Sequence, residues 1–517
     1  MNNLKIKPAK EMSIEELIGQ VIMIGLPFDY LDEFSKEFIN EYKIGNYILF
    51  ARNYNDSKQM KKLMNDLYTY TQSITESFPL VSIDQEGGMV VRLFKDVTFP
   101  ASPLTTSATS IDNAPYLTGE IIGKDMLKHG INLNLAPCLE INENLSNPLV
   151  NVRGYGATKE IVLTNATQFV EGIQASNALS CIKHFPGAGS STKDSHLELP
   201  IINEPKEQLL NYNMYPFAKL LKSDAVMTSH CIYNSFDEIP STLSHVLLTE
   251  TLRQDMGFEG LIISDGMEMN AIKDYYGIGE GCVIALNAGC DILLLCHEYE
   301  QQKLAFDAVI KAVKEGRILR STLEEKVERI NKAKEKALKG LLKYYNDDIY
   351  KIVEEEHSLM ESIVDNSYTL IKGTIPYVDD KTLIISSNAK VGSIVEDEFD
   401  DRNLTNALIH NFKNNKVIKF TKEENFKDEI LSIMDNYNHI LVFSYDAYCD
   451  SVQKDTINEL LKTDKEVHVV SIKGPIDMQY FNGLKNYSCL YEYTPNSIKT
   501  IIKQLKTNMQ LNGKLPL

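Results

Sequence analysis

The chain has 517 residues, a formal net charge of −18 at pH 7, 43% hydrophobic residues and 24% charged residues. This length exceeds one ordinary hydrophobic core and predicts two or three domains, and the composition is that of a globular protein. The acidic balance and the scattered Lys and Arg exclude a basic surface for nucleic acid or anionic membrane. No apolar run approaches a membrane span, and the polar N-terminal stretch lacks a signal-peptide core. We therefore expect a cytoplasmic protein without nucleic-acid partners or membrane insertion.

The eight cysteines lie mostly inside apolar runs, with no CxxC pair and no His at a spacing typical of zinc ligands. This pattern predicts reduced thiols in the core rather than disulfides or a zinc site. We accordingly expect no metal and no cofactor.

Residues 13–297 alternate short apolar runs with segments of helical spacing. The runs that qualify as strands are 21–25, 46–50, 80–84, 131–135, 179–184, 225–230, 261–265 and 291–296. Segments between them with helical spacing include 31–42, 57–70, 159–175, 207–221 and 247–256. Eight such units favour a closed (β/α)₈ barrel of the TIM type, with a doubly wound open sheet as the alternative. No glycine-rich nucleotide-binding motif follows the first run, so a nucleotide-binding sheet is disfavoured.

The second part of the chain shows another alternation. Residues 317–370 are charged and have helical spacing, and a turn region follows. Later strand candidates are 382–386, 417–420, 439–444, 466–472 and 489–493. We predict a catalytic barrel over 1–340, a helical linker over 341–378, and a smaller three-layer α/β sandwich over 379–517.

Charged side chains recur where the predicted barrel strands end. The third strand runs into 84–88 (DQEGG), the fifth ends at Lys183 and His184, the sixth at His230 and the seventh at Asp265. The carboxyl ends of barrel strands carry the active site of such enzymes. A loop broken by Pro and Gly follows His184 and brings Asp194 and His196 close in sequence. These positions predict a catalytic site.

Residues 183–196 (KHFPGAGSSTKDSH) resemble the K-H-F-P-G-H-G-x4-D-S-H signature of family 3 glycoside hydrolases, in the β-N-acetylglucosaminidase branch. Segments 83–88 with Arg92, 150–156, 226–230 and 257–265 agree with that family in order and spacing. The resemblance covers residues 13–340 well. It extends in outline to the C-terminal sandwich, which two-domain members of the family also carry.

The resemblance implies a retaining, exo-acting β-N-acetylglucosaminidase that hydrolyses terminal N-acetylglucosamine from glycosides such as peptidoglycan-derived cell-wall fragments. It implies that Asp265 is the nucleophile, that His196 is the acid/base and that Asp194 orients His196. The residues to which it gives a substrate-binding role are Asp84, Arg92, Arg153, Lys183, His184 and His230.

The residue chemistry is compatible with these roles. A carboxylate at the end of a rigid strand suits a nucleophile, although Asp265 is also placed to cap a helix. An imidazole ionises near neutral pH, so His196 can donate and later accept a proton. Glu86 and Glu268 are the next candidates for the proton donor. Arg92 and Arg153 suit either a sugar contact or an ion pair.

Two positions depart from the family pattern, and several alternatives stay open. Ala188 stands where the branch usually has a second His, and Gly266 where a second Asp often follows the nucleophile. The alternatives are a β-glucosidase, a phosphorolytic glycosidase, a metal-dependent hydrolase and a non-catalytic sugar-binding homologue. The Asp-x-His loop disfavours the β-glucosidase, and the first strand, which lacks His-x-His, disfavours the metallohydrolase. The aglycone, the glycosyl acceptor and the oligomeric state stay open.

Overall fold

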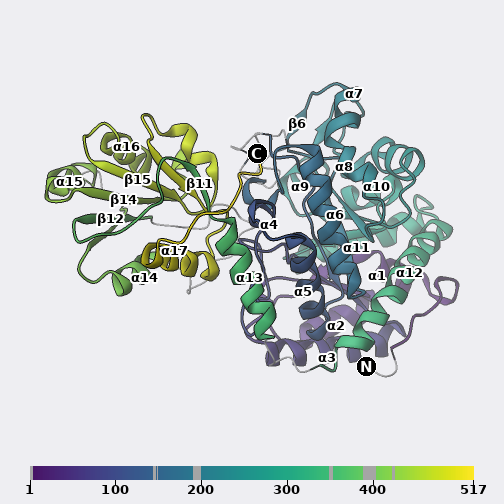
Figure 1. The fold of residues 1–517 in the computed structure, drawn as a ribbon. Coiled ribbons are helices and arrows are strands. Elements are labelled where there is room, and N and C mark those ends of the chain that lie inside the picture. The colour runs from purple at the N-terminus through teal and green to yellow at the C-terminus, as the bar shows by residue number, and fades with distance from the viewer. Residues whose placement is uncertain are drawn as a thin grey trace.

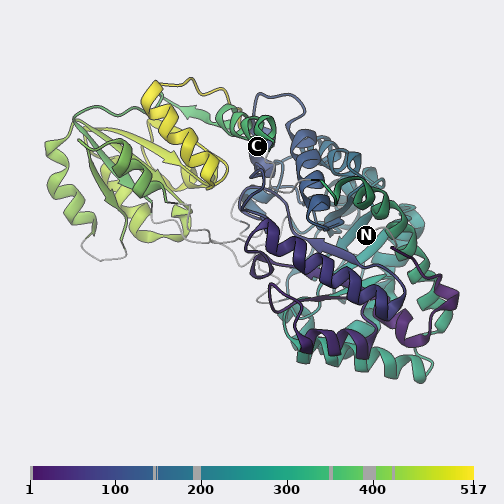
Figure 2. The ribbon, with the colours of Figure 1, turned by 90° about the horizontal axis from the view of Figure 1, so that it is seen from below.

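The computed structural model describes residues 4–143, 147, 150–189, 199–347, 353–387, 403–421 and 426–517. Asp194 and His196 lie outside these ranges. The described chain forms a barrel and a smaller sandwich that lie side by side, with the C-terminus at their junction (Figure 1 and Figure 2). Within the described ranges, no helix combines the length and apolarity that a bilayer span requires.

Eight parallel strands within the described ranges close the barrel, in the order β1-β10-β9-β7-β5-β4-β3-β2. They are β1 (Ile22–Gly25), β2 (Asn46–Leu49), β3 (Leu80–Ile83), β4 (Leu133–Asn134), β5 (Leu179–Phe185), β7 (Ala225–Thr228), β9 (Leu261–Gly266) and β10 (Ile292–Leu295). The predicted (β/α)₈ barrel is confirmed, and the open doubly wound sheet is wrong. A further short parallel pair, β6 (Ile201–Ile202) with β8 (Ile232–Tyr233), lies outside the barrel.

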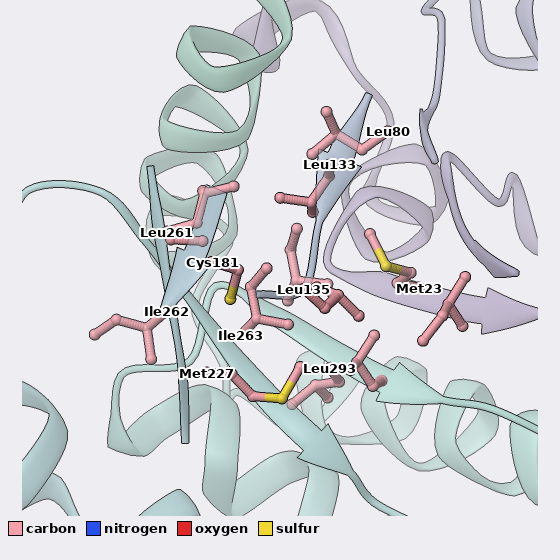
Figure 3. Close-up of a cluster of buried hydrophobic side chains, with 14 of the residues drawn as sticks. Met23, Leu80, Leu133, Leu135, Cys181, Met227, Leu261, Ile262, Ile263 and Leu293 are labelled. Atoms are coloured by element: carbon pink, nitrogen blue, oxygen red, sulfur yellow. The ribbon is translucent and has the colours of Figure 1, made fainter. Parts of the chain in front are cut away.

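The apolar runs of the strands form the barrel core. Leu80, Leu133, Ile263 and Leu293, from four different strands, gather in one cluster of buried side chains (Figure 3). Helices cover the outer face of the barrel, so both faces of each strand are removed from water. This explains why the strands read as nearly continuous apolar runs.

The helices around the barrel follow the predicted alternation. They are α1 (Ile14–Gln20), α2 (Glu33–Tyr42), α3 (Ser57–Thr75), α4 (Pro103–Ala108), α5 (Ala114–Lys128), α6 (Lys159–Ala175), α9 (Asn270–Tyr276), α10 (Ile278–Ala288), α11 (Tyr299–Lys314) and α12 (Arg320–Tyr344). Side-chain caps fix several starts: Asp56 accepts from the N–H of Gln59, and Thr158 accepts from that of Ile161.

Two predicted helices differ in geometry from expectation. Residues 207–221 form α7 (Lys206–Gln208), a π-helical turn η4 (Leu209–Asn213) and α8 (Tyr215–Lys219). Pro216 has no N–H to donate to the carbonyl of Tyr212, so the regular ladder is interrupted there. The helix expected over 247–256 is a π-helix, η6 (Val246–Asp255).

The sandwich is built on a sheet of order β11-β16-β15-β14-β12-β13. Its strands are β11 (Thr369–Lys372), β12 (Thr382–Ser386), β13 (Lys416–Lys419), β14 (His439–Ser444), β15 (Glu466–Ser471) and β16 (Asn486–Cys489). Its helices are α13 (Glu354–Ser367), α14 (Leu404–Asn411), α15 (Phe426–Ile433), α16 (Ser451–Leu460) and α17 (Pro495–Thr507). The helical reading of 317–370 is wrong at its end, because Thr369 and Leu370 pair antiparallel with Cys489 and Ser488.

The barrel and the sandwich are joined by buried contacts. Met89 and Val152 of the barrel part are buried in the same apolar cluster as the sandwich core. The N–H of Ser102 donates to Oε2 of Glu492 at 2.7 Å, and the Glu492 side chain is fully buried. The N–H of Tyr493 donates to the sulfur of Met89 at 3.3 Å.

Candidate active site

A cavity of about 500 Å³ opens at the carboxyl ends of the barrel strands. Asp84 follows β3, Lys183 and His184 lie on β5, and Asp265 lies on β9, so four predicted site residues meet in it. The loops after the strands add Arg92, Arg153 and Ala188 to its wall. The strand-end pattern in the sequence thus corresponds to one cavity.

Lys183 is the centre of an ion network in this cavity. Its Nζ lies 2.7 Å from Oδ1 of Asp84 and 2.7 Å from Oε1 of Glu86, and the side chain is only 2% exposed. Arg92 approaches the other oxygen of Asp84, with its Nη2 3.8 Å from Oδ2. Burial alone favours the neutral amine, but the two carboxylates outweigh it and raise the pKa of Lys183. Lys183 is therefore held as a cation against the cavity.

Arg153 and Glu86 form a bidentate pair. Nε of Arg153 donates to Oε2 of Glu86 at 2.9 Å, and Nη2 of Arg153 donates to Oε1 at 2.8 Å. Burial disfavours the Glu86 carboxylate, but Arg153 and Lys183 outweigh burial and hold the pKa of Glu86 well below its usual range. Glu86 is thus a permanent anion, which argues against it as a proton donor at neutral pH.

His184 is fixed by a residue that the sequence did not single out. Oε1 of the buried Glu140 accepts from the backbone N–H of His184 at 2.8 Å and lies 3.0 Å from its Nδ1. With Glu140 as a carboxylate, Nδ1 carries the proton and Nε2 is left as an acceptor. The sequence signal for Glu140 was weak, because it is one acidic residue after a short strand.

Asp265 lies at the end of β9, half-buried, and its Oδ1 accepts from the N–H of Gly266 at 2.7 Å. His230 is buried behind this segment: its Nε2 lies 2.9 Å from the carbonyl oxygen of Gly266, and its Nδ1 lies 2.8 Å from Oγ1 of Thr242. His230 is absent from the residues that line the cavity. His230 thus supports the backbone next to Asp265, and its predicted contact with the sugar stays a prediction.

An aromatic rim on the cavity was also missed from the sequence. The rings of Phe50 and His297, which both line the cavity, lie 4.9 Å apart, and the guanidinium of Arg52 lies 4.4 Å from the Phe50 centroid. Such a surface suits the apolar face of a sugar ring. Nearby, the Glu268 carboxylate accepts from the N–H groups of Cys296 at 2.5 Å and His297 at 2.9 Å. Glu268, the second alternative to His196 as proton donor, is therefore already held by hydrogen bonds from two backbone N–H groups.

The cavity contains a carboxylate at a strand end with buried cations beside it. It opens at the carboxyl ends of the strands of a (β/α)₈ barrel, which is where barrel enzymes have their active site. The model of the glycosyl hydrolase family 3 N-terminal domain matches residues 13–333. The chain belongs to glycosyl hydrolase family 3 and is a glycoside hydrolase.

Curated relatives match about half of the chain. A β-hexosaminidase from Tolumonas auensis is 34% identical over 282 residues, which cover 53% of this chain and 82% of that protein. β-Hexosaminidase A from Pseudoalteromonas piscicida is 31% identical over 279 residues, which cover 50% of this chain and 47% of that protein. The matched region thus spans about half the length of the Pseudoalteromonas relative.

Solved structures match both parts of the chain. A family 3 β-N-acetylglucosaminidase from Paenibacillus sp. str. FPU-7 has a TM-score of 0.90 and 30% identity, covering 98% of each chain. A β-glucoside phosphorylase has a TM-score of 0.80 at 20% identity, covering 98% of this chain and 94% of that chain. The phosphorylase likeness shows the shared fold alone.

Proposed function

We propose that this glycoside hydrolase is a retaining, exo-acting β-N-acetylglucosaminidase that acts on terminal N-acetylglucosamine, with peptidoglycan-derived cell-wall fragments as its natural substrates. The observation that carries the proposal is Asp265 at the end of β9, in the same cavity as the Lys183 ion network. The names of the relatives, β-hexosaminidase and β-N-acetylglucosaminidase, support the choice of sugar.

In the proposed reaction, a carboxylate oxygen of Asp265 attacks the anomeric carbon as the bond to the leaving oxygen breaks. His196 gives its proton to that oxygen, and Asp194 orients the imidazole. In the second step His196 takes a proton from water, the water oxygen attacks the anomeric carbon, and the bond to Asp265 breaks. Two inversions give net retention. Asp194 and His196 enter through their sequence motif, because they lie outside the described residues.

The cavity wall supplies groups that suit a polyhydroxylated ring. Asp84 offers an ionic acceptor for hydroxyls, and Arg92 and Lys183 offer charged donors. Nε2 of His184 adds an acceptor, because Glu140 holds Nδ1. Because these groups are held by one another, they need little reorganisation when the sugar binds. His230 lies next to the backbone that carries Asp265 and holds it in place through the carbonyl oxygen of Gly266.

Turnover of chromogenic glycosides tests this proposal. The 4-nitrophenyl β-N-acetylglucosaminide should be cleaved with a much higher kcat/KM than the matching glucoside. A preference for the glucoside would favour the β-glucosidase, and cleavage of neither would favour a sugar-binding homologue. A sugar 1-phosphate product in phosphate buffer would show phosphorolysis instead of hydrolysis.

A further inference from the structure

We propose that Cys138, Glu140 and His184 form a binding site for a divalent transition metal such as Zn²⁺, and that metal bound there blocks the sugar site. One Cys sulfur, one carboxylate oxygen and one imidazole nitrogen of these residues all lie within 4.8 Å of one another. The sequence spacing predicted no such cluster, because His184 comes from the neighbouring strand.

The distances approach those of a tetrahedral zinc site. Zinc bonds of about 2.0–2.3 Å to N, O and S place adjacent tetrahedral ligands about 3.3–3.7 Å apart. Oε1 of Glu140 and Nδ1 of His184 are already 3.0 Å apart. Small side-chain shifts would therefore admit an ion between these two atoms and the sulfur of Cys138.

The three side chains stand on a rigid frame. Cys138 and Glu140 lie two positions apart on the extended segment after β4, so they project to the same side. Cys138 forms a parallel bridge with Lys183 of β5, and the N–H of Leu139 donates to the carbonyl of Lys183 at 2.6 Å. The backbone N–H of His184 is bound to Glu140. Ligands held by strand backbone lose little entropy when they bind an ion.

The donor set also has suitable chemistry. Thiolate, imidazole and carboxylate are the usual protein ligands of zinc, whereas magnesium and calcium prefer oxygen alone. Burial raises the pKa of Cys138, so the thiol keeps its proton until metal displaces it. On binding, the thiol proton passes to solvent and the imidazole proton moves from Nδ1 to Nε2. The thiolate and carboxylate charges then balance the ion.

The position of the site connects it to the sugar. Glu140 and His184 line the cavity, so the fourth metal position faces the space proposed for substrate. Metal binding would also take Glu140 away from its role of orienting His184. This consequence rests on the proposed function, whereas metal binding itself does not. We therefore expect competitive inhibition by zinc, with the metal unnecessary for the reaction.

Cobalt spectroscopy tests the site directly. Titration with Co²⁺ should give a sulfur-to-cobalt charge-transfer band in the near ultraviolet that saturates at one equivalent and is removed by Zn²⁺. Cys138→Ser should lose the band. Cys231→Ser is the matched control, because Cys231 is a buried thiol that lines the cavity but lies outside the cluster, and it should keep the band. A band that survives Cys138→Ser, or one that Cys231→Ser removes, would overturn the proposal. Circular dichroism of each variant verifies folding, and Cys138→Ala is the second test if Cys138→Ser does not fold.

Inhibition kinetics test the consequence. Zn²⁺ should raise KM and leave kcat unchanged. Changes around a metal site weaken affinity about 10–100-fold, so loss of a ligand in Cys138→Ser should raise the zinc inhibition constant at least about 100-fold. Each variant is compared with itself with and without zinc. A cobalt band in a protein that cleaves no glycoside would retain the metal site and reject the proposed function. Glycoside cleavage by a protein that gives no cobalt band would reject the metal site and retain the proposed function.

Discussion

At the scale of single residues, neighbouring charges decide what each carboxylate in the cavity can do. Glu86 lies against two cations, Arg153 and Lys183, and stays ionised although it is buried. Asp265 lies at the end of β9 and lines the cavity, and its Oδ1 accepts from the N–H of Gly266. The two cations support Glu86 as part of the scaffold, and the strand-end position in the cavity supports Asp265 as the proposed nucleophile.

Glu86→Gln should lower the free energy of unfolding by about 3–5 kcal/mol, because it leaves two buried cations with one anion fewer. A carboxyl whose pKa is lowered by folding stabilises the protein above its unfolded pKa, and this stabilisation is lost as the pH falls toward the folded pKa. The difference between wild type and Glu86→Gln should therefore be full at pH 7 and shrink below about pH 4.3, the ordinary Glu pKa. Chemical denaturation at several pH values measures it.

Glu76→Gln is the control for this experiment. Glu76 pairs with Lys7 at 3.2 Å but its side chain is 71% exposed. Exposed pairs contribute about 0–1 kcal/mol, so this variant should change stability little. Equal effects of the two substitutions would contradict the account of Glu86.

His196→Ala should reduce the cleavage of glycosides with poor leaving groups far more than that of activated aryl glycosides. General acid catalysis is worth about 10²–10⁴-fold, and a good leaving group needs less of it. Asp194→Ala should show the same dependence at smaller size, because the imidazole remains. Rate constants across a series of leaving groups measure this slope. A uniform loss would mean that His196 only binds substrate or shapes its loop.

Much of the cavity could be predicted from the sequence because its residues follow apolar strands. Asp84, Lys183 and Asp265 each follow or end such a run, and a parallel barrel brings those ends together. Glu140 and Cys138 escaped notice because their role depends on pairing between β4 and β5. His230 follows β7, and its side chain is buried against Gly266 and Thr242. Spacing alone does not give the direction of a side chain, so this position could not be predicted.

At the scale of elements, the strand core gives the barrel its stability. Leu293→Ala on β10 should cost about 2–5 kcal/mol, because it leaves a cavity among fully buried side chains. Leu304→Ala on α11 is the matched control: the same change at a side chain that is 55% exposed should cost under about 1 kcal/mol. Denaturant midpoints of both variants test this. Similar shifts would contradict a core that depends on the strands.

Elements with a strong periodic pattern were predictable, and elements set by tertiary contact were not. The strands and α6 follow from apolar runs and helical spacing, and α6 has the predicted bounds. β11 comes after a long charged helical region, and its strand state depends on pairing with β16. The π-helical turn at Leu209–Asn213 could not be predicted from the sequence. Over one turn, a π-helix and an α-helix have the same pattern of apolar residues.

At the scale of the whole molecule, the sandwich supports the cavity through buried contacts. Gly88 follows Glu86 by two residues and packs so closely on Ser102 that an added Cβ would lie 2.3 Å from that of Ser102. Ser102 is held in turn by Glu492 of the sandwich. On the other side, Val152 precedes Arg153 and is buried in the cluster that includes the sandwich core. Glu86 and Arg153 thus both lie on segments that are held by contacts with the sandwich.

Glu492→Ala should lower both kcat/KM and the free energy of unfolding. It leaves the buried N–H of Ser102 without its acceptor, and it loosens the turn that carries Glu86. An unsatisfied buried group costs about 1–3 kcal/mol. If about half of this cost also raises the activation free energy, kcat/KM falls roughly twofold to tenfold. Glu492→Gln keeps an acceptor and should recover most of the loss. Lys499→Ala, which removes an exposed ion pair with Glu361, should change neither quantity.

Covalent trapping of the glycosyl-enzyme identifies the nucleophile. A 5-fluoro N-acetylglucosaminyl fluoride should inactivate the enzyme with a burst of one equivalent of fluoride, because formation of the glycosyl-enzyme outruns its hydrolysis. Peptide mapping by mass spectrometry should then place the sugar on Asp265, and Asp265→Asn should take up no label. A label on another carboxylate, or product released with inverted configuration, would contradict the account.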